Sequence, residues 1–232
     1  LSNKKGSLAR VALASIASFV VVGGLYFLMM KMQSKDYLAG SFSPFNYRIT
    51  QPFIMFHVFR SWFAPTELTA DTDWQAFTSI TDPYAIGGFI FVLIGLYVMF
   101  ITAEHKKTRP VAFGIAWFFL ANIPTTIIAF SEVTNDHRMF FPFVGLALAV
   151  TWALYLLADH FAYLVKENPS LKGVFFVTLF LILTGYAYGT CHRNEVWKTD
   201  ESLWADVAEK SPKNGRGLMN YGLALMAKGD YA

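Results

Sequence analysis

The sequence predicts an all-α, polytopic membrane protein that leads into a short helical segment of soluble character. Of its 232 residues, 55% are hydrophobic and only 15% are charged. Five stretches contain no Asp, Glu, Lys or Arg, and each approaches the ~20 residues that a helix needs to cross a bilayer core. These stretches cover residues 11–30, 85–103, 110–130, 139–158 and 173–190. Because a soluble core rarely contains five such runs in succession, we expect about five membrane spans within residues 1–190.

The first stretch is expected to remain in the protein as a span. It lacks the small-residue cleavage pattern of a secretory signal, and the chain opens on Leu1. The chain also stops inside the repeat-like segment described below. We therefore expect the 232 residues to be an internal piece of a longer protein.

Charged residues between the stretches predict how the chain is oriented. Basic residues precede the first stretch and fill the turn at 106–109, which suits the cytoplasmic side. Residues 65–84 carry four acidic residues and no basic one, which suits the outer side. Alternation from there places 131–138 and everything after residue 190 outside, and 159–172 inside. We expect an integral protein of a bacterial inner membrane or of the endoplasmic reticulum, with its C-terminus outside or in the lumen.

Net charge and cysteine content exclude several partners and sites. The net charge of +3 is small and unevenly spread, so no nucleic-acid partner is predicted. A single cysteine, Cys191, rules out an internal disulfide and a multi-cysteine metal site. Asp71 and Asp73 are a short acidic pair, but two carboxylates alone do not make a divalent-metal site. We predict no cofactor and no metal; membrane lipids and other membrane subunits are the expected partners within the bilayer.

A shorter aromatic segment follows at about residues 52–63. Pro52 can start a helix of about 12 residues, which covers roughly 18 Å and is too short to span. One side carries a polar stripe and the other is apolar, which suits a helix lying in the outer interface. The polar stripe is His57, Arg60 and Ser61, and the apolar face is Phe53, Phe56, Phe59, Trp62 and Phe63. The alternative is a sixth, partly buried span.

After residue 190 the chain changes to a soluble, helical pattern. An amphipathic helix is predicted at 201–210, and Pro212 lies in the break that follows it. The next segment resembles the first helix of a tetratricopeptide repeat, with Leu218, Tyr221 and Leu225 as packing and partner-binding positions. Since one unit cannot bury its apolar face alone, we expect an extracytoplasmic array at 191–232 and beyond that binds protein or peptide. The alternative is an ordinary amphipathic helix.

The strongest functional lead is the polar loop at 131–138, between two of the uncharged stretches. It holds Glu132, Asp136, His137 and Arg138 where a simple turn would need only Gly, Asn or Pro. Such a set can bind phosphate or move protons. The alternative is that Asn135 and Asp136 cap the next helix while Arg138 faces lipid headgroups.

Three segments together resemble one enzyme family. They are Asn46-Tyr-Arg-Ile-Thr-Gln51 followed by Phe63-Ala-Pro65 and Leu68-Thr-Ala-Asp71, the run from Phe118 to Pro124 leading to Glu132 and Asn135, and His137-Arg-Met139 leading to Pro142. The pattern resembles the transmembrane and tetratricopeptide-repeat O-mannosyltransferases and their bacterial relatives, over nearly the whole chain. The resemblance implies transfer of a sugar from a polyprenyl-phosphate donor to a protein hydroxyl on the outer or lumenal side.

The resemblance also implies roles for single residues. The family's catalytic acid lies in its first outer loop, which we expect upstream of this chain, so no catalytic residue is assigned. His137, Arg138 and Arg48 are candidates to hold the donor phosphate, and Glu132 and Asp136 are candidates to orient it or the acceptor. The substrate would be a lipid-linked sugar phosphate. The alternative function is a non-catalytic, membrane-anchored tetratricopeptide-repeat scaffold or accessory subunit of a larger membrane complex.

Overall fold

The computed structural model describes residues 43–162 and 169–229, with a few helical positions nearer the N-terminus. Those positions are Ile16, Phe19, Val20, Gly23, Gly24, Phe27, Leu28 and Lys31. Most of the span predicted at 11–30 therefore lies outside the described residues. The chain divides into two compact units, Leu1–Ala39 and Gly40–Ala232, and the second is described below.

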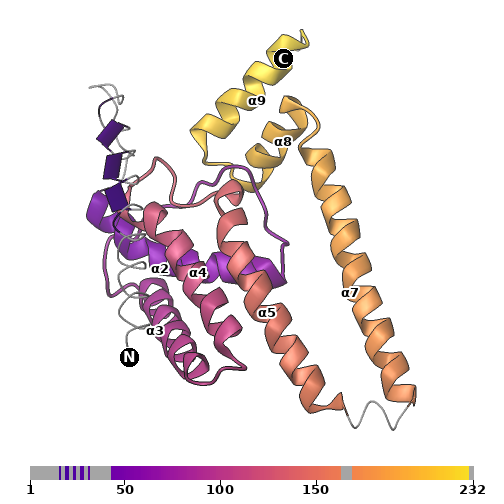
Figure 1. Cartoon of the computed structure of the whole chain (residues 1–232). Helices are drawn as coiled ribbons and strands as arrows, with labels where there is room; N and C mark the ends of the chain where they lie inside the picture. Colours follow the sequence, from indigo (N-terminus) through magenta and orange to yellow (C-terminus); the bar gives the residue numbers. More distant parts are fainter. Residues whose placement is uncertain are drawn as a thin grey trace. The chain divides into compact units, whose positions relative to one another are not determined.

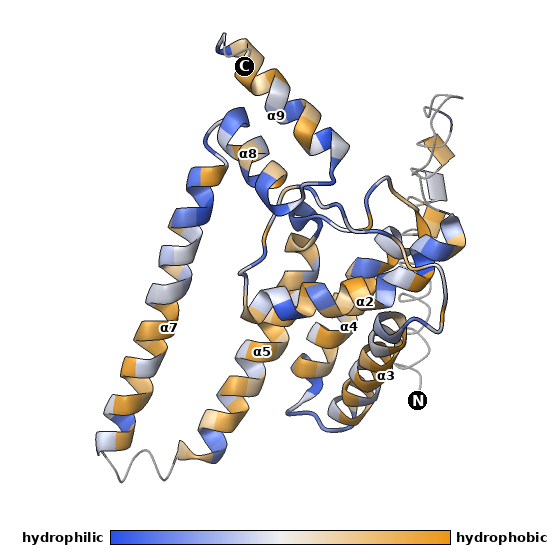
Figure 2. Cartoon of the chain, turned by 180° about the vertical axis from the view of Figure 1, so that it is seen from behind, coloured by the Kyte–Doolittle hydropathy of each residue, from blue (hydrophilic) through white to orange (hydrophobic). Residues whose placement is uncertain are grey.

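All regular secondary structure in the described part of the second unit is helical (Figure 1). Its helices are α2 (Pro44–Phe63), α3 (Pro83–Glu104), α4 (Arg109–Ile127), the 3-10 helix η1 (Asp136–Arg138), α5 (Phe140–His160), α7 (Pro169–Val196), α8 (Asp200–Lys210) and α9 (Gly215–Ala227). The helices α3, α4, α5 and α7 are long and apolar enough to cross a membrane, and Figure 2 shows the hydrophobic residues along them. The prediction of an all-helical fold is confirmed for this part of the chain, and four of its helices could cross a membrane.

Side-chain hydrogen bonds mark the start of α3 and the turn between α3 and α4. The Asp82 carboxylate accepts the Tyr84 backbone N–H at 2.8 Å, which caps α3 at its N-terminus. At the opposite end of α3, the Thr108 hydroxyl donates to the Thr102 carbonyl at 2.6 Å and closes the turn into α4. The Trp152 indole N–H donates to the Lys107 carbonyl at 2.7 Å, so α5 passes the same turn.

Glycines allow the helices to approach closely. A Cβ atom on Gly114 of α4 would lie 2.5 Å from the Gly145 carbonyl oxygen of α5. A Cβ atom on Gly88 of α3 would lie 2.3 Å from the Phe53 backbone nitrogen of α2. Since lipid gives apolar helices no hydrophobic reason to associate, close van der Waals contact at small residues is what holds such helices together.

The helix α2 differs from the short helix expected at 52–63. It begins at Pro44, has 20 residues, contains Pro52 in its interior and lies across α3, α4 and α5 (Figure 1). His57 and Ser61 of the expected polar stripe are buried, whereas Arg60 is exposed. The physical reason is that loops cover this face: the Gln51 amide donates to the Val133 carbonyl at 3.2 Å, and the His57 ring lies 4.6 Å from that of Trp74.

The helix α7 stands apart from this packing. Among the described helices it packs closely only against α8, and no residue of its apolar window is buried. The Tyr186 hydroxyl connects it to the end of α2 by donating to the Trp62 and Phe63 carbonyls at 2.9 and 3.1 Å. The exposed apolar surface suits a helix surrounded by hydrocarbon.

A matched pair of glycines tests the close approach of α2 and α3. We expect Gly88→Ala to lower the free energy of unfolding by about 1–3 kcal/mol, because its Cβ would meet backbone atoms of α2. A Cβ atom on the neighbouring Gly87 would have no other atom within 4 Å, so Gly87→Ala should change stability by less than about 0.5 kcal/mol. Thermal unfolding of the two purified variants in the same detergent is the measurement. Equal losses would contradict the packing described for Gly88.

Candidate functional site

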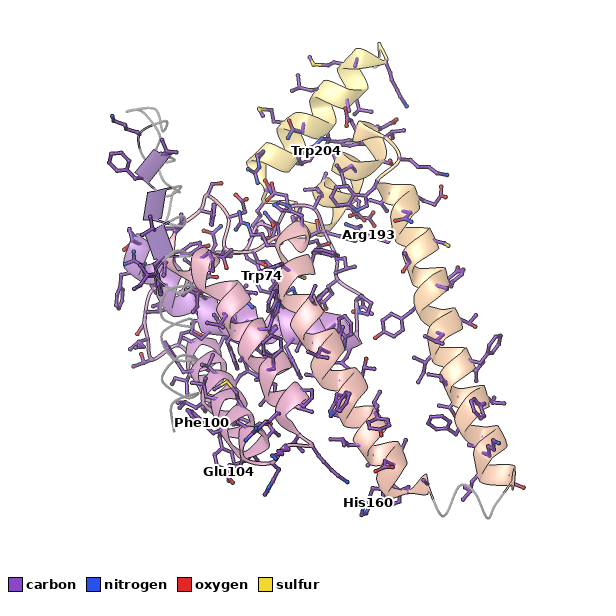
Figure 3. The ribbon with its side chains drawn as sticks, in the orientation of Figure 1. Trp74, Phe100, Glu104, His160, Arg193 and Trp204 are labelled. Atoms are coloured by element: carbon purple, nitrogen blue, oxygen red, sulfur yellow. The ribbon has the colours of Figure 1, made fainter. Side chains whose placement is uncertain are left out.

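Polar residues collect at one end of α3, α4 and α5. Loops 64–82 and 128–139 meet the α8–α9 segment there, and we call these three segments the polar layer. Figure 3 places Arg193 and Trp204 near this end and Glu104 and His160 at the other. The layer is hydrogen-bonded between its loops, since the Thr72 hydroxyl donates to the Thr134 carbonyl at 3.2 Å. The charge pattern predicts all three segments on one side of the membrane, and they do lie together; the compartment they face stays a prediction.

The centre of the polar layer is the carboxylate of Asp71, whose side chain is 3% exposed. The Arg216 guanidinium of α9 lies 2.7 Å from it and 3.3 Å from the Glu132 carboxylate. The Ser211 hydroxyl donates to the Asp71 carbonyl at 3.3 Å. A buried carboxylate is costly unless it is paired and hydrogen-bonded, and Arg216 supplies that pairing. Asp73 accepts the Lys213 backbone N–H at 3.2 Å, so the two acids serve separate contacts of the C-terminal segment.

Glu132 and Arg138 form a second, partly buried pair in loop 128–139. Their side chains are 12% and 18% exposed, and the Arg138 guanidinium lies 2.7 Å from the Glu132 carboxylate and 4.1 Å from the Phe130 ring centre. Burial alone would raise the pKa of Glu132, but the Ser131 hydroxyl, Arg138 and Arg216 together lower it below its ordinary value. Arg138 is therefore engaged within the chain.

The other candidates of this loop occupy different environments. His137 is exposed, and the exposed Arg48 of α2 donates to the Ile127 carbonyl at 3.3 Å. Neither Asn135 nor Met139, at the N-terminal boundaries of η1 and α5, makes a side-chain capping hydrogen bond. The Asn135 amide instead donates to the Glu132 carboxylate at 3.0 Å.

Asp136 belongs to a third charge cluster that connects η1 with α7 and α8. The Arg193 guanidinium lies 2.7 Å from Asp206 but 3.6 Å from Asp136, too far for a hydrogen bond. The Nη2 atom of Arg193 is buried with no hydrogen-bond partner in the described part of the chain. Lys210 lies 2.6 Å from Asp206. Burial raises the pKa of Asp136 to about 7, although Arg193, Lys210 and the Thr69 amide act in the opposite direction.

Asp136 lines a polar cavity of about 280 Å³ within the layer. The cavity is bounded by α2, both loops and the α8–α9 turn, through His57, Glu67, Trp74, Thr134, Lys210 and Ser211 among others. Burial, with a contribution from Arg60, lowers the pKa of His57 against the opposing effect of Glu67, so its imidazole is neutral near neutral pH. The cavity thus combines a neutral imidazole, an ammonium group and two carboxyl groups.

A second cavity, of about 310 Å³, is aromatic and shares Trp74 with the first. The Phe53 ring of α2 lies within 6.0 Å of the Trp74, Phe77 and Tyr84 rings, centre to centre. The Thr50 hydroxyl accepts the Phe77 backbone N–H at 2.7 Å and is thereby satisfied. The Gln75 amide, which also borders this cavity, donates to the Asp73 carbonyl at 3.1 Å, and apart from Thr50 the rest of the lining is aromatic.

Replacement of Asp71 tests the centre of the polar layer. We expect Asp71→Asn to lower the free energy of unfolding by about 1–3 kcal/mol, because the buried ionic contact of Asp71 with Arg216 at 2.7 Å is lost and Arg216 keeps only the longer contact with Glu132. Asp73→Asn is the control and should cost less than about 0.5 kcal/mol, since in the described contacts the Asp73 carboxylate accepts only from the Lys213 backbone amide. Limited proteolysis of the α8–α9 segment reports the same loss locally. Equal sensitivity of both variants would contradict the central position of Asp71.

The raised pKa of Asp136 makes stability depend on pH. The folded state holds the Asp136 proton up to about pH 7, whereas the unfolded chain releases it near its ordinary value of 3.8. Stability should therefore fall as pH rises from about 4 to 7, by at most about 4 kcal/mol, and level off above that. Asp136→Asn should flatten the dependence of the thermal midpoint on pH, and Asp73→Asn should leave it unchanged. An Asp136→Asn variant that keeps the wild-type slope would show that another group titrates.

The structure brings Glu132, Arg138 and Asp136 together in the polar layer and leaves Arg48 and His137 exposed. Sequence reasoning missed the basic and acidic residues contributed by α7, α8 and α9, since no local pattern links them to loops far earlier in the chain. They are Arg193, Asp206, Lys210 and Arg216. Comparison with known protein families, characterised proteins and solved structures gives no match.

Proposed function

We propose that the membrane helices and the polar layer form a platform that holds the C-terminal helical segment in one orientation, where it binds a protein or peptide outside the membrane. The observation that carries this proposal is the contact of Arg216 with both Asp71 and Glu132. One guanidinium of α9 thereby joins loop 64–82 to loop 128–139. Such an arrangement ties the segment to two connections between membrane helices at once.

Further polar contacts from the α8–α9 turn support a defined orientation. The Lys210 ammonium donates to the Leu68 carbonyl at 2.8 Å, and the Asn214 amide donates to the Thr72 carbonyl at 3.2 Å. Asn214 also accepts the Gly217 backbone N–H at 3.0 Å and so caps α9. The residue that starts α9 is therefore the same residue that attaches it to loop 64–82.

One face of α9 offers an exposed apolar surface for a partner. Leu223 is 55% exposed, and it lies four residues from Met219 and three from Met226, so the three side chains share one face. Tyr221 and Leu225, predicted as packing positions, are half-buried, whereas Leu218 is 47% exposed. Exposed methionine and leucine side chains on one helix face suit an amphipathic helix or peptide. Continuation into a tetratricopeptide-repeat array would enlarge this surface.

A second function, sugar transfer, is favoured by the polar cavity. Asp136 faces that cavity with a pKa near neutral, which suits a group that accepts a proton from an acceptor hydroxyl. A lipid-linked sugar phosphate would be the donor. The engagement of Arg138 by Glu132 weakens its assignment to the donor phosphate and is the reason for ranking the platform first.

Site-specific cross-linking in native membranes tests the platform. We expect a photoreactive residue at Leu223 to form a protein adduct, and one at the exposed Glu209 of α8 to form none. Arg216→Ala should reduce the Leu223 adduct about three- to tenfold, because the segment loses its fixed orientation. Absence of an adduct at Leu223, or equal adducts at both positions, would contradict the platform.

The same membranes separate the two functions. On the platform proposal, Asp136→Asn leaves the Leu223 adduct intact. On the transfer proposal, the wild-type protein moves hexose from polyprenyl-phosphate hexose to a serine- and threonine-containing peptide, and Asp136→Asn abolishes that transfer. Transfer that depends on Asp136, without an adduct at Leu223, would reverse the ranking of the two functions.

A further inference from the structure

We propose that the polar and the aromatic cavity form the two halves of one binding site for a zwitterionic lipid with a primary-amine headgroup. The headgroup occupies the polar cavity, and the first part of one acyl chain occupies the aromatic cavity. This inference goes beyond the platform, and its ligand would occupy the same polar cavity that the sugar-transfer alternative uses. It rests on the position of Trp74, on the charges of the polar cavity and on the place of the aromatic cavity beside a membrane helix.

Trp74 connects the two halves. Its ring lies 4.6 Å from the ring of His57, which lines the polar cavity, and 6.0 Å from that of Phe53, which lines the aromatic cavity. A ligand that passes Trp74 would therefore meet polar groups on one part and rings on the other. That is the profile of an amphiphile.

The charges of the polar cavity match a headgroup with both signs. Glu67 and Asp136 offer carboxyl oxygens from the two loops, and Lys210 offers an ammonium from α8. A primary ammonium has three N–H donors and binds best where carboxylate and hydroxyl oxygens surround it. Lys210 and the Thr66 and Thr134 hydroxyls of the same cavity can then donate to the phosphodiester. A lipid with negative charge alone would meet the two carboxyl groups without any ammonium of its own.

Each of these charged groups also has a partner within the chain. Glu67 lies 3.2 Å from Arg60, and both side chains are at least half exposed, so this pair exchanges easily with solvent. Lys210 is held 2.6 Å from Asp206, and Asp136 lies 3.6 Å from Arg193. The two pairs with the longest distances are those of Glu67 and Asp136, the two acids that the ammonium would approach.

The aromatic cavity lies where an acyl chain can enter it. Tyr84 stands in the first turn of α3, one of the helices apolar enough to cross a membrane, and it is 64% exposed. The near-parallel rings of Phe77 and Tyr84, 6.4 Å apart, border the same space. Since the cavities measure about 310 and 280 Å³, each near the lower end of the ~300–1,000 Å³ typical of ligand sites, they fit a headgroup and part of one chain.

Direct binding to the purified full-length protein tests the site. The probes are dioctanoyl phosphatidylethanolamine, phosphatidylcholine and phosphatidylglycerol, measured by native mass spectrometry and by the shift of the thermal midpoint in one detergent. We expect the ethanolamine lipid to bind about tenfold more tightly than the other two. Equal affinity for the ethanolamine and choline lipids would overturn recognition of the primary amine. Stronger binding of the glycerol lipid would overturn the zwitterionic headgroup.

Two exposed positions test the halves separately without threatening the fold. Glu67→Gln should reduce the preference for the ethanolamine lipid to less than about twofold, and Asp73→Asn should leave it unchanged. Tyr84→Ser should weaken all three lipids about three- to tenfold without altering their order, whereas Tyr97→Ser, exposed on the same helix, should have no effect. A Glu67→Gln variant that keeps the full preference, or equal effects at Tyr84 and Tyr97, would place the lipid elsewhere.

Discussion

The buried carboxylate of Asp71 constrains the rest of the polar layer. With 3% of its side chain exposed, it would carry an unpaired charge out of water if Arg216 did not reach it from 145 positions later in the chain. The same guanidinium lies 3.3 Å from Glu132, so the two loops and the C-terminal segment share one cation. Removing the C-terminal segment would leave the buried Asp71 carboxylate without its cation.

The helix α2 contacts both loops of the polar layer. Gln51 donates to the Val133 carbonyl, and Thr50 accepts the Phe77 amide, so α2 satisfies backbone groups of both loops. Gly88 also allows α3 to pack directly against the α2 backbone at Phe53. The packing of apolar helices through small residues thus determines where the loops lie, and the loops in turn determine where acids and bases can meet.

These relations explain which features the sequence could predict. The stretch 85–103 agrees within two residues with α3, because a run of apolar residues is a local signal of a membrane helix. Because proline favours the first turn of a helix, the sequence predicts that this helix starts at Pro52. In the structure Pro52 lies inside α2, which begins at Pro44 and is held by contacts with the loops. The pairing of Asp71 with Arg216 could not be predicted from the sequence. No local sequence pattern distinguishes Asp71 from Asp73, and the difference between them arises only when the chain folds.

The C-terminal segment serves the polar layer in two ways that are physically linked. Through Arg216 it neutralises Asp71, and through Lys210 it supplies the one ammonium group among the residues described as lining the polar cavity. Lys210 is also bound to Asp206, which holds Arg193 at the end of α7. A ligand that draws Lys210 toward the cavity must therefore change the balance between Asp206 and Arg193. By reciprocity, whatever fixes α8 against the loops also changes the affinity of the cavity for that ligand.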